Sequence, residues 1–159
     1  VDLKAFTEDF YHKLTSSKLA LVLDTIKWLK NETDIWIELT TLLIPNENDS
    51  DDEIKRMSEW VLENIGDEVP HHFTAFHPTF KMQNHERTPL ATVKSAREIA
   101  MSTGIKYVYT GNVHNPEAET TYCPNCKTPL IERDWHRVRL NSLIKGKCIT
   151  CNTKIKGHF

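Results

Sequence analysis

The chain contains no apolar run near the roughly 20 residues that a membrane-spanning helix needs. Its first residues lack the charged segment and the small-residue cleavage site of a secretory signal. There is no low-complexity segment, and no internal repeat beyond an alternation of strand-like and helix-like stretches. From these absences we expect the chain to fold as a soluble protein. With 39% hydrophobic residues among 159, the sequence predicts a cytoplasmic protein with one domain and a small appendage, and no membrane partner.

Cysteine is scarce and confined to one stretch. The four cysteines form two Cys-x-x-Cys pairs, Cys123 with Cys126 and Cys148 with Cys151, and 21 residues separate the pairs. Two such pairs supply the four thiolates of a structural zinc site. Because four protein sulfurs leave no position open for water or substrate, we expect this zinc-ribbon-like module to be structural. Rubredoxin-like iron and a pair of redox disulfides remain as alternatives.

Acidic residues are rare near the carboxyl terminus. The chain has 20 Lys and Arg against 22 Asp and Glu, but residues 123–159 hold eight basic and two acidic residues. A basic tail can bind nucleic acid or an acidic partner. A zinc ion with four thiolates is itself a dianion that offsets part of this charge. Since basic residues are not interleaved with a run of stacking aromatics, the sequence favours a solvated face and no nucleic-acid partner.

Hydrophobic periodicity predicts alternating strands and helices in residues 1–112. Such an alternation indicates a parallel α/β unit of four strands. Residues 113–121, which contain Pro116 and several acidic residues, are expected to be a linker to the cysteine module at residues 122–159. The expected strands are residues 1–6, 34–44, 71–77 and 105–110, and the expected helices are 8–14, 18–30, 51–65 and 89–103.

Polar residues at the expected helix starts give specific capping predictions. Thr7 should cap the first helix, Ser16 or Ser17 the second, and Thr88 the fourth. The sequence Ser50-Asp-Asp-Glu53 has the pattern of a capping box.

Candidate functional residues follow from the architecture. Working residues in parallel α/β folds lie at the carboxyl ends of strands and in the loops that follow them. For His77 alone, a surface or capping role is the plainer interpretation, and Asp2 with Lys4 could form an ordinary exposed ion pair. Polar residues at these ends are Asp2, Lys4, Thr40, Thr41, His77 and Asn112.

Three strand motifs and the cysteine tail resemble one known family. Asp2-Leu-Lys4, Leu-Thr-Thr-Leu-Leu-Ile-Pro45 with Asn48-Asp-Ser, and His-Phe-Thr-Ala-Phe-His77-Pro occur in this order. Gly111-Asn-Val then precedes the four cysteines. The chain resembles the carboxyl-terminal part of the radical SAM enzymes of the AmmeMemoRadiSam system, which are similar to pyruvate formate-lyase activating enzyme.

That resemblance implies half of a radical SAM (β/α) barrel, with Asp2, Lys4 and His77 holding the methionine part of S-adenosylmethionine. It also implies a 4Fe-4S cluster, but the chain lacks the Cys-x-x-x-Cys-x-x-Cys motif that would hold one. We therefore expect this chain to be inactive alone and to require an amino-terminal part of the barrel, since it begins inside a strand. The resemblance allows a protein substrate without identifying it.

Several residues depart from the family pattern. Thr40 stands where activating enzymes place an arginine, and Asn46 stands where a glycine is usual. Lys127 and Asn152 likewise follow the cysteine pairs where glycine is common. The alternative to an enzyme portion is a stand-alone zinc-clip module that docks on nucleic acid or protein.

Overall fold

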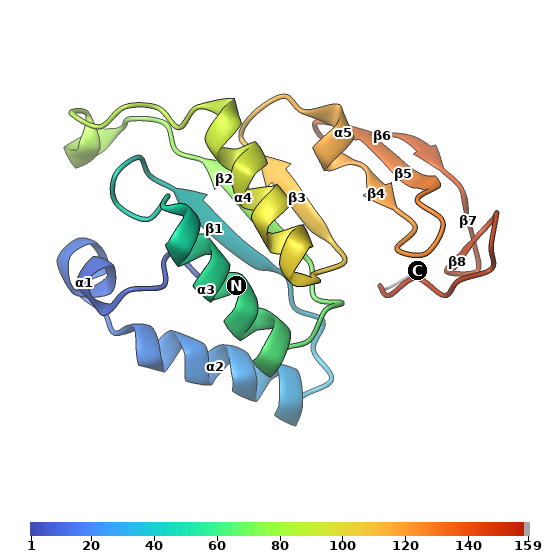
Figure 1. Cartoon of the computed structure of the whole chain (residues 1–159), viewed down its shortest axis with the longest axis horizontal. Helices are drawn as coiled ribbons and strands as arrows, with labels where there is room; N and C mark the ends of the chain where they lie inside the picture. The colour runs from blue at the N-terminus through green and yellow to red at the C-terminus, as the bar shows by residue number, and fades with distance from the viewer. Residues whose placement is uncertain (158–159) are drawn as a thin grey trace. The chain divides into compact units, whose positions relative to one another are not determined.

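The computed structural model describes residues 1–157 and divides the chain into two compact units, Val1–Val113 and His114–Phe159. Each unit is described by itself. The first unit alternates helices and strands, and the second consists mainly of short antiparallel strands (Figure 1). No helix within residues 1–157 combines the length and apolar character needed to span a bilayer.

The first unit is built on a parallel sheet of three strands in the order β1-β2-β3. The strands are β1 (Leu39–Leu43), β2 (His71–Ala75) and β3 (Val108–Gly111). Its helical elements are α1 (Glu8–Phe10), a π-helix (Tyr11–Thr15), α2 (Leu19–Glu32), α3 (Asp51–Asn64), a 3-10 turn (Phe80–Met82) and α4 (Leu90–Thr103).

The expected first strand is much shorter than predicted. Asp2 forms a single parallel bridge with Thr40 of β1. Two backbone hydrogen bonds hold this segment: Leu3 N–H donates to the Thr40 carbonyl at 3.0 Å, and Thr40 N–H donates to the Val1 carbonyl at 2.9 Å. The expected strand at 34–44 begins only at Leu39. Pairing with β2 starts at this residue, opposite His71, and Leu39 N–H donates to the Pro70 carbonyl.

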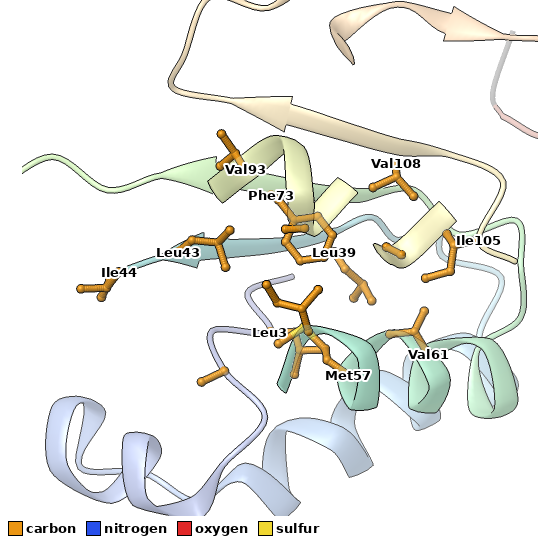
Figure 2. Close-up of a cluster of buried hydrophobic side chains, with 14 of the residues drawn as sticks. Leu3, Leu39, Leu43, Ile44, Met57, Val61, Phe73, Val93, Ile105 and Val108 are labelled. Atoms are coloured by element: carbon orange, nitrogen blue, oxygen red, sulfur yellow. The ribbon is translucent and has the colours of Figure 1, made fainter. Parts of the chain in front are cut away.

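The two faces of the sheet differ in burial. Side chains at alternate positions of all three strands, such as Leu39 and Phe73, are fully buried against α3 and α4. Figure 2 shows them interlocking with Met57 and Val61 of α3 and Val93 of α4. The opposite face carries the half-buried positions of each strand and is the face on which polar side chains collect.

Two capping predictions are confirmed and two are wrong. The hydroxyls of Thr7 and Ser50 accept backbone N–H groups at the starts of α1 and α3. No serine caps α2; instead the Glu8 carboxylate accepts the N–H groups at its start. Thr88 does not cap α4, because its hydroxyl donates to the carbonyl of Leu43 and accepts from Phe76 N–H.

The capping box is only half formed. Ser50 Oγ accepts from Glu53 N–H at 3.3 Å, but the Glu53 carboxylate accepts from Phe6 N–H at 2.6 Å instead of turning back to Ser50. Burial raises the pKa of this carboxyl. The acidic side chain thus ties the amino-terminal segment to α3.

The second unit contains two small antiparallel sheets. One has the order β4-β5-β6, with β4 (Thr121–Tyr122), β5 (Pro129–Asp134) and β6 (Arg137–Asn141). The other pairs β7 (Leu143–Ile144) with β8 (Lys147–Cys148). The expected linker is partly ordered, since it includes the short helix α5 (Pro116–Glu119) and the start of β4.

Candidate functional site

The two Cys-x-x-Cys segments form matching turns. In the first, Lys127 N–H donates to the carbonyl of Cys123, and in the second Asn152 N–H donates to the carbonyl of Cys148, both at 3.0 Å. Lys127 and Asn152 both adopt φ of 60°, in the left-handed region that favours glycine. Both turns thus adopt a conformation that favours glycine, and this chain reaches it with Lys127 and Asn152.

These turns bring the four thiols together. Their sulfur atoms all lie within 4.8 Å of one another, with Cys123 Sγ 3.5 Å from Cys151 Sγ and Cys126 Sγ 3.6 Å from Cys148 Sγ. Four sulfurs at about 2.3 Å from one tetrahedral ion lie about 3.8 Å apart. The arrangement therefore fits a single metal ion held by four thiolates.

The surroundings of the thiols favour the charged form at two positions. Thr153 lowers the pKa of Cys151 to about 5 through its hydroxyl and its backbone N–H, and Thr128 lowers the pKa of Cys126 in the same way. Burial raises the pKa of Cys123 to about 11. A bound cation would lower the pKa of Cys123 again, because metal-bound thiols are deprotonated.

Asp2 and Lys4 lie together on the half-buried face of the sheet. Lys4 Nζ is 3.0 Å from Asp2 Oδ2, and their side chains are 45% and 60% exposed. The Lys4 backbone is fixed on both sides, since its N–H donates to the Tyr11 hydroxyl and its carbonyl accepts from the Asn48 side-chain amide. The pair is thus a rigidly mounted but accessible combination of carboxylate and ammonium.

His77 follows the carboxyl end of β2 and is exposed. Its Nε2 lies 3.1 Å from the carbonyl of Asn112, so Nε2–H is the donor and Nδ1 carries the free lone pair. Asn112 is itself held by a hydrogen bond from its side chain to the Ala75 carbonyl. The β1 strand separates β2 from Asp2, and Asp2 is level with Thr40 and His72. His77 is therefore two strand spacings of about 4.8 Å from the Asp2 segment and also lies five residues beyond His72 along the chain.

The structure also groups residues that sequence reasoning missed. Glu38 Oε2 lies 2.8 Å from His72 Nε2, and the His72 ring stacks on Tyr109 with centroids 5.1 Å apart. Thr40, His72 and Tyr109 are in register across the three strands. Only the sheet register shows this row, because the residues are distant in sequence; the one available signal was the period-two alternation within each strand.

Thr41, in contrast, faces the buried side. Its hydroxyl donates to the Leu3 carbonyl at 2.6 Å and lies 2.9 Å from His71 Nε2. Burial lowers the pKa of His71 to about 3, which keeps the ring neutral, and its Nδ1 has no hydrogen-bond partner within residues 1–157. Thr41 is therefore a core residue and leaves Thr40 as the threonine of β1 on the half-buried face.

The loop after β1 contains a left-handed residue where glycine was the usual expectation. Asn46 adopts φ of 66°, and its N–H donates to the Asp49 carboxylate. Asn48 folds inward, where its side chain contacts the backbone of Ile44 and Leu42. The substitution of glycine by Asn46 thus leaves the left-handed backbone conformation in place.

Comparisons with known proteins place this geometry in context. The chain is 41% identical over 157 residues to a curated protein of Methanocaldococcus jannaschii named uncharacterized protein MJ0808. The match covers 98% of this chain but 46% of that protein, so the chain spans about half the length of its relative. No protein-family model matches the chain.

A solved structure shares the fold. It is a domain of pyruvate-formate lyase-activating enzyme from Bacteroides vulgatus, with a TM-score of 0.59 and 17% sequence identity. The match covers 70% of this chain and 65% of that domain. The parallel α/β sheet of this chain is thus similar in fold to a domain of an activating enzyme, and four clustered cysteines able to hold a metal ion accompany it.

Proposed function

We propose that this chain is the carboxyl-terminal portion of a radical SAM enzyme of the pyruvate formate-lyase activating enzyme type. The observation that carries the proposal is the accessible Asp2–Lys4 ion pair on the half-buried face of a sheet whose fold matches an activating-enzyme domain. In this proposal the face is the inner wall of a barrel, and strands from a longer protein complete it. The relative's greater length is consistent with such a completion.

The residue types suit the amino-acid end of S-adenosylmethionine. That end carries a carboxylate and an ammonium next to a sulfonium, and Lys4 and Asp2 can pair with the first two by charge-assisted hydrogen bonds. His77, after the end of β2, offers Nδ1 as a further acceptor. Exchange of the internal Asp2–Lys4 pair for a ligand pair costs little, because exposed ion pairs contribute about 1 kcal/mol or less.

The cysteines have a different role. We assign Cys123, Cys126, Cys148 and Cys151 to a structural zinc ion, since four thiolates at these separations fill a tetrahedral shell. They do not form the three-cysteine motif of a radical SAM cluster, so a 4Fe-4S cluster would have to be held by other residues of the longer protein. A cluster supplies the electron for reductive cleavage when it is bound.

Calorimetry with S-adenosylmethionine tests the proposal on this chain. Without the cluster iron, we expect weak binding in the high micromolar to millimolar range, about -4 to -6 kcal/mol. Lys4→Ala and His77→Ala should each weaken binding further, whereas His12→Ala, an exposed histidine on the π-helix, should not. Chemical reduction should release no deoxyadenosine.

Two results would count against the proposal. One is binding that is equally strong in wild type, Lys4→Ala and His77→Ala. The other is cleavage of S-adenosylmethionine by this chain alone, because no residue of the chain supplies the cluster motif.

A further inference from the structure

The last part of the second unit is rich in basic residues and contains no acidic residue. Residues 135–157 include six Lys and Arg and no Asp or Glu. Arg139 forms an ion pair with Asp134, just outside this stretch. Arg137, Lys145, Lys147 and Lys154 are exposed, and none has an ion-pair partner within residues 1–157.

Two of these lysines face each other. Lys147 and Lys154 are partners in an antiparallel bridge, so like charges stand directly opposite and destabilise the pair. A metal ion with four thiolates, next to Lys147 in sequence, would offset about two positive charges. The stretch as a whole still keeps an excess that an anionic partner can neutralise.

An aromatic ring is presented beside this charge. Trp135 is 53% exposed and lies in the two-residue turn between β5 and β6, with φ of 53°, a conformation that favours glycine in such turns. Its N–H donates to the Glu119 carboxylate at 2.9 Å, and its ring stacks on His114 at an interplanar angle of 14°. The turn thus holds a large exposed ring in place despite an unfavourable backbone conformation.

Strand β6 connects the ring to the lysines. All five of its residues are exposed, and it forms the outer strand of its sheet (Figure 1). From Trp135 the chain runs through β6 and β7 to the Lys145 turn, ten residues that span at most roughly 33 Å at about 3.3 Å per residue. Arg137 and Lys145 therefore follow the ring on one continuous segment, and Lys147 and Lys154 lie on the paired segments after the turn.

We infer that this path binds single-stranded nucleic acid, with phosphates on Lys145, Lys147 and Lys154 and a base stacked on Trp135. Lysines supply the charge that neutralises phosphates, and aromatic rings stack on unpaired bases of any sequence. An acidic polypeptide would pair with the lysines but would leave the exposed part of the Trp135 ring uncovered. The sequence alone favoured a solvated face, because it did not show that a strained turn presents Trp135.

The test uses the metal-loaded full chain and a fluorescein-labelled single-stranded RNA of about 12 nucleotides. Fluorescence anisotropy should show saturable binding at about 50 mM salt that weakens steeply toward about 200 mM. The variant Lys147→Ala/Lys154→Ala should weaken binding and lower the slope of log K against log salt by about 1.4, because each phosphate contact contributes about 0.7.

Substitutions at the turn separate recognition from folding. Trp135→Ala should weaken binding about tenfold, and Trp135→Phe should restore most of it, because stacking needs only an aromatic face. Trp135→Gly suits the turn conformation, so it should keep the metal and the fold while losing affinity. The matched control is Lys30→Ala/Lys55→Ala on the first unit, which should bind like wild type.

The inference is overturned if the RNA does not bind at about 50 mM salt with metal present. It is also overturned if polyglutamate competes as well as unlabelled RNA, which would identify an acidic protein partner instead. Affinity that is unchanged in both the lysine and the tryptophan variants would equally contradict it. None of these outcomes depends on binding of S-adenosylmethionine, so this inference and the proposed function fail independently.

Discussion

The two units of this protein reach a folded state by different means. The main buried hydrophobic cluster consists of 24 side chains that all belong to the first unit. Among residues 114–157, the buried hydrophobic side chains are only Ala118, Cys123, Leu130, Cys148 and Ile155. A unit of this size cannot fold by burial alone and normally needs a metal or disulfides. We therefore expect apolar burial to stabilise the first unit, and a metal ion held by the cysteines to stabilise the second unit.

Metal removal should produce the largest difference in stability between the two units. We expect one zinc per chain by elemental analysis, and structural zinc contributes about 10 kcal/mol or more to small folds. Chelation, or Cys148→Ser, should therefore unfold the second unit and leave the amide spectrum of the first unchanged. Ser142→Ala is the control in the same unit. A spectrum of the second unit that stays folded without metal would contradict this division.

A cavity in the hydrophobic core should destabilise the first unit and leave the second unit folded. Phe73 is fully buried in the sheet, so Phe73→Ala should destabilise the first unit by about 3–5 kcal/mol through transfer and cavity terms. Leu21→Ala, at a position that is 61% exposed, should change stability little. Urea denaturation followed by signals of each unit measures both. If Phe73→Ala also lowered the metal affinity of the second unit, the two units would not be independent.

Low pH should also destabilise the first unit, through the buried imidazole of His71. The folded-state pKa of His71 is about 3, whereas an unfolded histidine titrates near 6.5, so only the unfolded chain takes up this proton between these values. Stability of the first unit should be unaffected above pH 7 and should fall by about 2–3 kcal/mol by pH 4.5 from this group. His71→Gln should lose less stability over that range in amide-exchange measurements on β1, and His72→Gln should behave like wild type.

The smallest effect concerns the first cysteine turn. Lys127 has a left-handed backbone, so Lys127→Gly should stabilise the metal-loaded second unit by about 0.5–1 kcal/mol. Asn125→Gly, in the same turn at a residue without positive φ, should be neutral or destabilising. Thermal denaturation followed by signals of the second unit compares the two variants. A lower melting temperature for Lys127→Gly would contradict the strain argument.

Local features were predictable from the sequence and long-range partners were not. The spacing of the cysteines predicted that their thiols converge, and the alternation of strands and helices predicted a parallel sheet. Glu8 and Glu53, however, accept N–H groups 11 and 47 residues away, at positions that depend on how segments pack. Short-range capping rules placed a serine at the start of α2, where Glu8 accepts instead, and expected Glu53 to turn back to Ser50, which does cap α3.

The candidate site shows the same limit. Asp2 and Lys4 were selected as polar residues near a strand end and by the family resemblance, and their ion pair was expected because residues two apart share one face of a strand. Glu38, His72 and Tyr109 were missed because their contacts depend on the register between strands, which no local pattern specifies. Within residues 1–157 the expected first strand pairs with β1 through a single bridge, so hydrophobic alternation there overstated its length.

The most direct test of the proposed function is an NMR titration of the metal-loaded, isotope-labelled chain with S-adenosylmethionine. We predict amide shifts at Asp2, Lys4 and His77, with none around Cys123 or Cys148, because the proposal places the cofactor on the sheet and a structural ion at the cysteines. Shifts confined to the cysteine turns, or no shift at millimolar cofactor, would contradict it.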